Sequence, residues 1–179
     1  KLAEEGIKVA LISSGESGFY GMAGLLLELL QKIKKEYRPY FEVHPGISSV
    51  QLAAAISGAP LMNDFCSVSL SDKLTPWSLI EKRIKGALVG DFVIALFNPQ
   101  SIERNWQLKS VIDICLQSRH GDTPVLVARQ VGRENQTKKF FTLNTIPFKE
   151  IDMLSIIIIG NSQTTLIDEI FLKIGRAHV

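Results

Sequence analysis

The chain has 179 residues, 46% of them hydrophobic and 21% charged, and its 20 basic and 18 acidic side chains leave a formal net charge of only +2. These values are ordinary for a globular protein and exclude a disordered or fibrous chain. The charge is too small for a protein whose main partner is nucleic acid or an acidic membrane surface, and no apolar run is long enough to span a membrane. We therefore expect neither of these as a partner.

The two cysteines, Cys66 and Cys115, lie far apart in apolar stretches and have no neighbour of a metal-ligand type. This pattern favours buried, reduced thiols over a disulfide or a zinc site. We therefore expect a reducing, cytoplasmic compartment and no bound metal.

The two ends of the sequence also carry predictions. The chain begins at Lys1 without the features of a signal peptide, which suggests that its beginning is missing. Residues 173–179 can be back-translated as the start of a common sequencing adapter. We expect them to be a non-native tail and exclude them from the functional argument.

The first part of the chain predicts alternating strands and helices. Residues 7–12 form an apolar run that ends in a glycine-rich turn, which is typical of a buried strand. Apolar residues at helical spacing from Met22 to Ile33 predict a helix, residues 40–43 a second strand, and the alanine-rich residues 48–57 a second helix. We place a domain boundary near residues 61–64, so that residues 1–62 are a partial N-terminal α/β domain.

The second part predicts a larger α/β domain, residues 63–172. Thr75 and Pro76 indicate a helix start, with Thr75 as the N-cap, and a second helix presents one apolar face over residues 106–116. Strands are expected at residues 65–70, 91–97, 125–128, 138–143 (in a hairpin) and 153–159, the last of them central because it is apolar on both faces. The alternation predicts mainly parallel or mixed sheets flanked by helices.

The residues that follow the predicted strands are rich in Gly, Ser and Asn, which allow close approach to a ligand. Ligands of open α/β sheets bind beyond the carboxyl ends of strands. Residues 13–18 form either an anion-binding turn or a plain turn, and their spacing matches neither the phosphate loop nor the Rossmann fingerprint. No Ser-His-Asp set or acid pair is evident, which favours an enzyme that holds two ligands in line over one that supplies a nucleophile. These loops are residues 13–18, 44–49, 69–72, 98–99, 129–133 and 160–164.

Taken together, these loops resemble those of the tetrapyrrole methylases, which transfer a methyl group from S-adenosylmethionine. Within that family the sequence is similar to the enzymes that methylate C17 of precorrin-3B, with contraction of the ring, in cobalamin biosynthesis. The ordered elements Leu-Ser-Asp, Thr-Pro-Trp, Phe-Asn-Pro and Gly-Asn-Ser-Gln-Thr carry this finer similarity. The matching stretches are residues 9–24, 43–55, 58–65, 69–81, 91–101 and 152–164.

Two departures from the family pattern stand out. Gly15-Glu16-Ser17 replaces the usual Gly-Asp-Pro, which loosens the turn because Ser lacks the fixed φ of Pro. The family's first strand and its Gly-x-Gly-Pro-Gly-Asp loop do not occur in this sequence. We therefore expect an incomplete N-terminal domain and no methyl-transfer activity from this fragment by itself.

The resemblance also implies a two-domain fold, a homodimer, and S-adenosylmethionine bound in the cleft between the domains. The substrate carries many carboxylates, so basic side chains near the cleft are candidates to bind it, although each of them is also explained as a solvated cation. Asp72 is the one weak catalytic candidate: it could orient a substrate N–H or act as a base, and the alternative is that it caps the helix near Thr75. The positions matched to the cofactor are Ser14, Gly15, Glu16, Phe19, Ser48, Ser49, Asn98, Ala128 and Gly160, and the basic candidates are Lys73, Arg104, Arg129 and Arg133.

Two other functions stay open at this point. One is methylation of another carbon of the corrin precursor, against which the Thr-Pro-Trp and Asn-Pro elements weigh. The other is a non-catalytic α/β ligand-binding module, which the altered turn at Glu16 and Ser17 favours. Substrates with and without cobalt both agree with the sequence.

Overall fold

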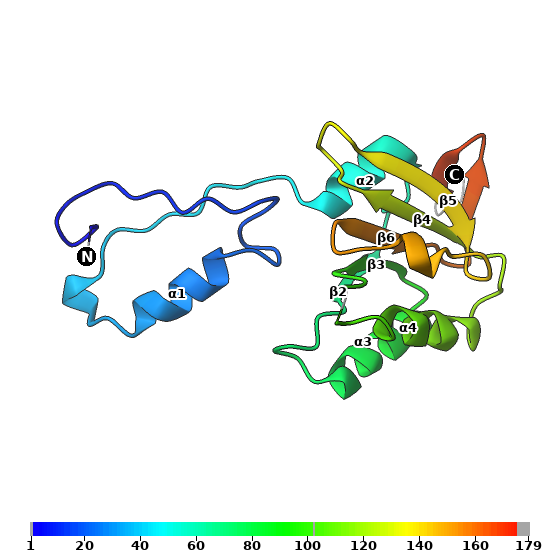
Figure 1. Cartoon of the computed structure of the whole chain (residues 1–179), viewed down its shortest axis with the longest axis horizontal. Helices are drawn as coiled ribbons and strands as arrows, with labels where there is room; N and C mark the ends of the chain where they lie inside the picture. Colours follow the sequence, from blue (N-terminus) through cyan, green and yellow to red (C-terminus); the bar gives the residue numbers. More distant parts are fainter. Residues whose placement is uncertain (1, 102, 175–179) are drawn as a thin grey trace. The chain divides into compact units, whose positions relative to one another are not determined.

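The computed structural model describes residues 2–101 and 103–174, and its contacts group the chain into two units, residues 1–49 and residues 50–179 (Figure 1). Residues 50–62, which the sequence assigns to a first domain, cluster with the second unit. The predicted division into family domains at residue 62 stays a prediction. No helix of the described residues is both long and apolar enough to cross a membrane.

The first unit contains one α-helix, α1 (Ala23–Gln31), and a 3-10 turn, η1 (Lys35–Tyr37). The helix predicted from the apolar spacing is thereby confirmed, with shorter bounds. Its carboxyl end is held by Arg38, whose Nε and Nη2 donate to the carbonyl oxygens of Ile33 and Gln31 at 2.7 and 3.1 Å. Such bonds satisfy carbonyl groups that a helix end leaves without an intrahelical partner.

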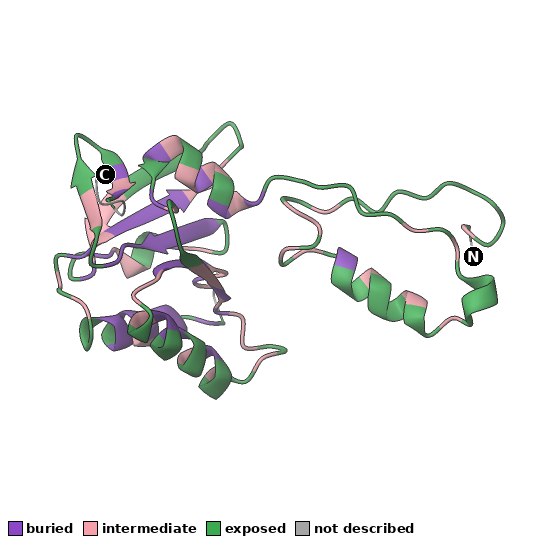
Figure 2. Cartoon of the chain, turned by 180° about the vertical axis from the view of Figure 1, so that it is seen from behind, coloured by how far each residue is buried: buried purple, intermediate pink, exposed green. Residues whose placement is uncertain are grey.

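The strands predicted at residues 7–12 and 40–43 are wrong, because neither segment forms a strand in the structure. Ile12 is 90% exposed and Val9 59% exposed, and Figure 2 shows most of this unit in the colour of exposed residues. A strand is stable only when a neighbour pairs with its backbone groups. The described part of the first unit contains no such neighbour, so the apolar pattern alone does not produce a strand.

A five-stranded mixed sheet organises the second unit, in the order β2-β3-β6-β4-β5. Strands β2 and β3 are parallel, β6 is antiparallel to both β3 and β4, and β5 is antiparallel to β4. The central position predicted for residues 153–159 and the hairpin predicted for residues 138–143 are confirmed. The strands are β2 (Phe65–Ser69), β3 (Val93–Phe97), β4 (Pro124–Arg129), β5 (Thr137–Thr142) and β6 (Ser155–Ile159).

Helices cover both faces of this sheet (Figure 1). On one face, α3 (Trp77–Val89) and α4 (Gln107–Leu116) bury a core that includes Ile80, Val111 and Ile157. On the other face, Lys138 of β5 donates to the carbonyl of Ile56 in α2 (Ser49–Ser57) at 2.8 Å. The predicted N-cap Thr75 is wrong, because Pro76 occupies the cap position with ψ 139° and no side chain caps the helix.

A second sheet of three short strands was not predicted from the sequence. Its order is β1-β8-β7, with β1 (Gly58–Ala59) parallel to β8 (Ile170–Lys173) and β8 antiparallel to β7 (Thr164–Ile167). Asp168 and Glu169 form the two-residue turn between β7 and β8, with φ 47° and 61°, as tight hairpin turns require. Phe171 of β8 is fully buried, with its ring centroid 6.0 Å from that of Phe140.

Part of the predicted tail lies in this sheet. Lys173, the last residue of β8, pairs with Thr164 of β7, and its Nζ donates to the carbonyl oxygen of Asp64 at 3.0 Å. Residues 175–179 lie outside the described residues, so the non-native origin of residues 173–179 stays a prediction. A further 3-10 turn, η2 (Phe148–Glu150), precedes β6.

Candidate functional site

The carboxyl ends of β2, β3 and β4 meet at one edge of the five-stranded sheet. Strands β3 and β4 are both antiparallel to β6, so they run in the same direction, and β2 is parallel to β3. The turn that begins β6 lies at this edge too, because Ser155 pairs with Arg129 at the end of β4. We call residues 69–72, 98–101 and 129–133 the carboxyl edge. It brings together Asp72, Asn98 and Arg129, as the sequence predicted for loops that follow strands.

Asn98 fixes the geometry where β2 and β3 end. Its φ of 51° lies in the left-handed region, where Asn is among the few tolerated non-glycine residues. Its Nδ2 donates to Oγ of Ser69 at 2.9 Å, and the backbone N–H of Ser71 donates to the same oxygen at 3.3 Å. The backbone N–H of Leu70 donates to the carbonyl of Phe97 at 2.9 Å. Asn98 therefore joins two loops that a ligand at this edge would touch.

Ala128 lies one residue before the end of β4 and is fully buried. Its neighbour Val127 belongs to the core beneath α3 and α4. Because successive side chains of a strand point to opposite faces, Ala128 faces the other side of the sheet, the side of α2.

The four basic candidates differ sharply in their surroundings. Lys73 and Arg133 are exposed. Arg129 is paired with Asp152, to whose Oδ2 both its Nε and Nη2 lie at 2.9 Å. Arg104 is only 6% exposed, its Nη2 donates to the sulfur of Met153 at 2.9 Å, and its buried Nε has no partner among the described residues. Only this guanidinium therefore suits the role of an anion receptor inside the fold.

Asp72 is attached to α4. Its Oδ2 accepts a hydrogen bond from Nε2 of Gln107 at 2.9 Å, and Gln107, the first residue of α4, is 3% exposed. The alternative role of Asp72 as a cap for the helix near Thr75 is wrong, because no side chain caps α3. The amide oxygen of Gln107, Oε1, is buried and has no partner among the described residues, and the same holds for Oε1 of Gln100. Two acceptors at the carboxyl edge are thus left without partners among the described residues.

Gly160 is not brought together with these residues. It follows β6, which runs antiparallel to its neighbours, so it lies at the opposite edge, where its N–H donates to the carbonyl of Pro124 at 2.9 Å. Its carbonyl accepts from Nη1 of Arg119, whose Nη2 donates to the carbonyl of Phe92. The side chain of Asn161 donates to the carbonyl of Asp91 at 2.8 Å. This polar network, missed from the sequence, has a structural role in joining β6 to the start of β3.

Within the first unit, the two predicted loops lie against each other. Gly15 has φ 74°, a left-handed conformation, and its backbone passes close to Ile47 and Ser48. A Cβ added at Gly46 would overlap the carbonyl oxygen of Gly15, so only glycine allows this approach. Oγ of Ser17 lies 3.5 Å from the carbonyl oxygen of His44. The loops that carry Ser14, Gly15 and Glu16 and Ser48 and Ser49 are therefore brought together.

Phe19 belongs to the turn that leads from the first loop into α1. Its backbone N–H donates to the carbonyl of Glu16 at 3.2 Å, and the N–H of Ala23, the first residue of α1, donates to the carbonyl of Ser17 at 3.0 Å. The substitution of Gly-Asp-Pro by Gly15-Glu16-Ser17 is thus accommodated in a turn that still ends in a helix.

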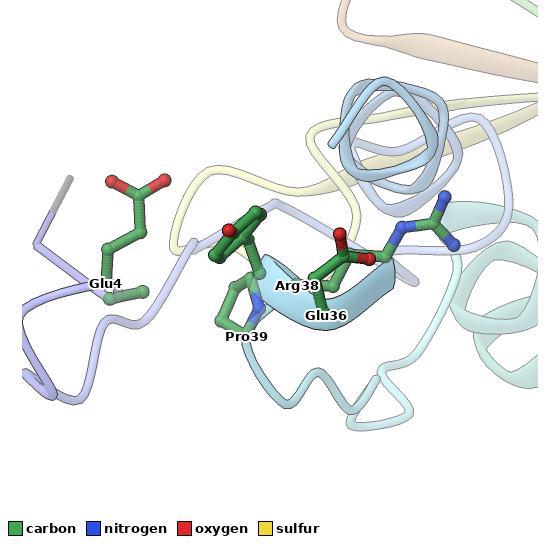
Figure 3. A pocket seen from close by; sticks show the side chains of 6 residues that line it. Glu4, Glu36, Arg38 and Pro39 are labelled. Atoms are coloured by element: carbon green, nitrogen blue, oxygen red, sulfur yellow. The ribbon is translucent and has the colours of Figure 1, made fainter. Parts of the chain in front are cut away.

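A hollow of the first unit lies elsewhere. It has a volume of about 440 Å³ and is lined by Ala3, Glu4, Glu36, Tyr37, Arg38 and Pro39 (Figure 3). Arg38, the one cation among the described residues that line it, is already engaged with the carbonyl oxygens at the end of α1. No residue predicted for the site lines this hollow, so it is not the candidate site. Among the residues that the structure describes, no three His, Cys, Asp or Glu side chains are grouped so as to hold a metal ion.

Comparison with known proteins indicates the family of the chain. The family model of Tetrapyrrole (Corrin/Porphyrin) Methylases matches residues 1–147. The "Probable cobalt-factor III C(17)-methyltransferase" of Salmonella typhimurium is 45% identical over 172 residues, which are 96% of this chain and 70% of that protein. The "Cobalt-factor III methyltransferase" of Priestia megaterium is 44% identical over 174 residues, 96% of this chain but only 32% of that protein.

A solved structure shows the same fold. The crystal structure of the methyltransferase CobJ superposes with a TM-score of 0.90 at 34% identity, over 95% of this chain and 71% of that one. The α/β tetrapyrrole methylase fold expected from the sequence is thereby confirmed, although its second sheet was not predicted. The chain belongs to the tetrapyrrole (corrin/porphyrin) methylase family.

Proposed function

We propose that the protein transfers a methyl group from S-adenosylmethionine to C17 of a corrin precursor, precorrin-3B or its cobalt form, with contraction of the ring, in cobalamin biosynthesis. The observation that carries this proposal is the 45% identity, over nearly the whole chain, to a protein whose name specifies C17 and cobalt-factor III. The second relative, at 44% identity, is also named for cobalt-factor III. These names favour the cobalt form as the substrate.

The loops of each unit suit the cofactor that this family uses. In the first unit, the backbone of Gly15 packs against the loop of Ile47 and Ser48, where a Cβ at Gly15 would meet only ordinary contacts, the nearest at 3.7 Å. In the second unit, the buried Oε1 atoms of Gln100 and Gln107 are acceptors without partners, which the donors of an adenosyl group would satisfy. The proposed binding residues are Ser14, Gly15, Glu16, Phe19, Ser48, Ser49, Asn98 and Ala128, without Gly160.

The proposed chemistry asks the chain to position ligands rather than to form a covalent intermediate. When bound, S-adenosylmethionine supplies a methyl group on a sulfonium, which is displaced in line by a carbon nucleophile. Asn98 and Ser69, joined by their hydrogen bond, hold the end of β3 against that of β2 and so shape the surface that receives the ligand. Holding the two ligands in line in this way lowers the activation free energy of methyl transfer without any nucleophilic side chain. Asp72, held by Gln107, is the candidate to accept the proton that leaves the substrate.

A chimera tests the proposal. The 172 residues that align with the Salmonella protein replace the corresponding stretch of that protein, and methyl transfer from S-adenosylmethionine to cobalt-factor III and to precorrin-3B is measured by mass spectrometry. We expect a product one methyl group heavier, modified at C17, from the chimera and from the parent enzyme. A folded chimera that is inactive beside an active parent, or one that methylates another carbon, contradicts the proposal. The same assay on the 179-residue chain tests the prediction that it is inactive alone.

The homodimer implied by the resemblance stays part of the proposal. The first unit exposes apolar side chains of α1, with Leu25 50% and Leu29 49% exposed, which is the kind of surface that association covers. Light scattering of the chimera at tens of micromolar, roughly the range for an interface of standard size, is expected to give the mass of a dimer. A monomer at that concentration contradicts it.

A further inference from the structure

Arg104 carries a buried charge that nothing in the described part of the chain neutralises. Arg104 is only 6% exposed, yet it takes part in none of the ion pairs between described residues. Its hydrogen bond to Met153 uses a thioether sulfur, which is a weak acceptor, and its Nε has no partner. Buried cations in proteins are normally paired with an anion. The surroundings of Arg104 therefore lack the anion that its burial calls for.

The other cations of the carboxyl edge do not share this property. Arg129 has its carboxylate in Asp152, and Lys73 and Arg133 are exposed to water, which solvates their charge. A substrate anion at those positions would compete with an existing ion pair or with solvent. At Arg104 the anion would instead meet N–H donors that folding has already removed from water, so binding carries little further cost of desolvating the guanidinium.

A second feature of the same segment favours an anion. Ser101 and Arg104 exchange backbone hydrogen bonds of 2.9 and 3.1 Å, and this turn leads directly into α4. The N-cap of α4, Trp106, provides no side-chain hydrogen bond to the first turn of the helix. The first N–H groups of a helix have no intrahelical partner and carry the positive end of its dipole. Gln107 in that turn is 3% exposed, and its Oε1 has no partner among the described residues; as an acceptor, this oxygen would take an N–H donor of a ligand and not its anion.

We propose that Arg104 and the first turn of α4 bind a carboxylate of a ligand of this enzyme. The inference rests on the proposed function, because both ligands of that reaction carry carboxylates: the acid side chains of the tetrapyrrole and the methionyl part of the cofactor. The planar guanidinium offers paired N–H donors that match the two oxygens of a carboxylate. The Oε1 atoms of Gln107 and Gln100, which lack partners among the described residues, are acceptors and take N–H donors, as proposed above for the adenosyl group, and not the carboxylate.

The test compares binding by the full 179-residue chain and three variants. Arg104→Met removes the charge at similar volume, Arg104→Lys keeps the charge without the planar fork, and Arg83→Met removes an exposed cation of α3 as the matched control. Two probes are titrated by calorimetry: uroporphyrin III, a stable polycarboxylate tetrapyrrole, and S-adenosylhomocysteine. We expect Arg104→Met to weaken one of them at least tenfold, about 1.4 kcal/mol, and Arg104→Lys to restore part of this loss. Arg83→Met leaves both affinities unchanged.

Thermal melting without ligand separates binding from structure. Because Met replaces an unpaired buried charge, Arg104→Met is expected to melt no lower than the unsubstituted chain. A fall of several degrees in the melting temperature makes Arg104 a structural residue and overturns the inference, as does unchanged affinity for both probes. Loss confined to uroporphyrin III assigns the carboxylate to the substrate, and loss confined to S-adenosylhomocysteine assigns it to the cofactor. If the unsubstituted chain binds neither probe, the inference about Arg104 is overturned, whereas the proposed function is tested separately by the activity of the chimera.

Discussion

Arg129 and Asp152 form an ion pair in which two guanidinium nitrogens, Nε and Nη2, each lie 2.9 Å from the same carboxylate oxygen. The other oxygen of Asp152 accepts from the backbone N–H of Leu154 and from Oγ of Ser155, both at 3.0 Å. One carboxylate thus ties the end of β4 to the turn that begins β6. Arg129 therefore supports the carboxyl edge rather than offering a free cation to the substrate.

Asp152→Asn is expected to lower stability in a pH-dependent way. Partial burial raises the pKa of Asp152, but the hydrogen bonds from Arg129 and Ser155 outweigh this and lower its pKa below 3.8. A carboxyl group whose pKa is lower in the folded state stabilises that state above its unfolded pKa, and this contribution is lost as the pH falls through the folded pKa. Because both side chains are more than a third exposed, we expect a loss of about 0.5–1 kcal/mol near neutral pH.

Urea unfolding of Asp152→Asn and of the unsubstituted chain, at neutral pH and at a pH below the pKa of Asp152, measures how much of the lost stability depends on pH. Asp113→Asn, which breaks the exposed pair with Lys109 along α4, is the matched control and is expected to cost about 0.3–0.5 kcal/mol. A loss at Asp152 that persists unchanged in acid contradicts an ionic origin.

Gly46→Ala is expected to disrupt the paired loops of the first unit. The added Cβ would overlap the carbonyl oxygen of Gly15, so the loops must separate, at a cost of about 1–3 kcal/mol by overpacking. Gly15→Val acts differently, because its Cβ has room but its φ of 74° disfavours a β-branched side chain. Both variants should weaken binding of S-adenosylhomocysteine, measured by calorimetry.

Gly24→Ala is the control for this pair of variants. A Cβ there meets nothing within 4 Å, and Gly24 lies inside α1, where alanine is favoured over glycine by up to about 1 kcal/mol. We expect it to leave the affinity unchanged and to stabilise the helix. If Gly46→Ala and Gly15→Val bind as tightly as Gly24→Ala, these loops do not contact the cofactor.

Asn98 supplies both a backbone conformation and a hydrogen bond, and two substitutions separate them. Asn98→Gly keeps the φ of 51° without strain but loses the bond to Ser69, which should cost about 1 kcal/mol. Asn98→Ala loses the bond and also places a Cβ in the left-handed region, for a total of about 2–3 kcal/mol. Urea unfolding gives both values. Equal stability of the two variants would show that the backbone at this position carries no strain.

The central sheet shows what periodicity can and cannot predict. The unbroken apolar run before Gly160 indicates a strand buried on both faces, and β6 is indeed central, with Ile157 and Ile158 fully buried. Such an apolar pattern does not indicate whether the strand runs parallel or antiparallel to its neighbours. Because β6 runs antiparallel to β3 and β4, Gly160 lies at the edge opposite to Asn98. The sequence therefore predicted that the loops after β2, β3 and β4 lie at one edge, but it could not predict that Gly160 lies at the opposite edge from them.

Other differences have equally physical causes. Residues 7–12 have strand composition, but a strand also needs a partner, which composition does not reveal. The hairpin of β7 and β8 turns at Asp168 and Glu169, which lack the usual Asn-Gly signal. Arg104 looks like Lys73 or Arg133 in the sequence, because the burial of a charged side chain is decided by the tertiary packing around it.

Both cysteines are expected to react slowly in the folded chain. Burial raises the pKa of the Cys66 and Cys115 thiols to about 11. Since the thiolate is the reactive form, a rise from 9 to about 11 lowers its population near pH 8 roughly a hundredfold. Alkylation by iodoacetamide, followed by mass spectrometry, should be slower by at least that factor than in urea. Equal rates in both conditions would contradict burial of the thiols.

The same groups predict a loss of stability in alkali. A thiol whose pKa is raised on folding stays protonated in the folded state while it ionises in the unfolded state, so its contribution is lost as the pH rises from 9 towards about 11. Alanine in place of both cysteines should remove this part of the pH dependence.

Hydrogen exchange decides between the structure and the sequence pattern for residues 7–12. In the structure, the backbone N–H of Ile7 donates to the carbonyl of Leu2, and no backbone hydrogen bond between described residues is donated by residues 8–12. The amides of β6, by contrast, pair with β3 on one side and β4 on the other, in the interior of the sheet. We expect residues 8–12 to exchange at nearly the rate of an unfolded peptide and β6 to be protected about 10⁴-fold or more, since its amides open only on global unfolding.

Residues of α1 serve as an internal reference, because they have helical hydrogen bonds but belong to the same unit as residues 8–12. Protection of residues 8–12 that matches β6 would show that they are paired in a sheet, as their apolar pattern predicts, and would overturn the conformation described for them.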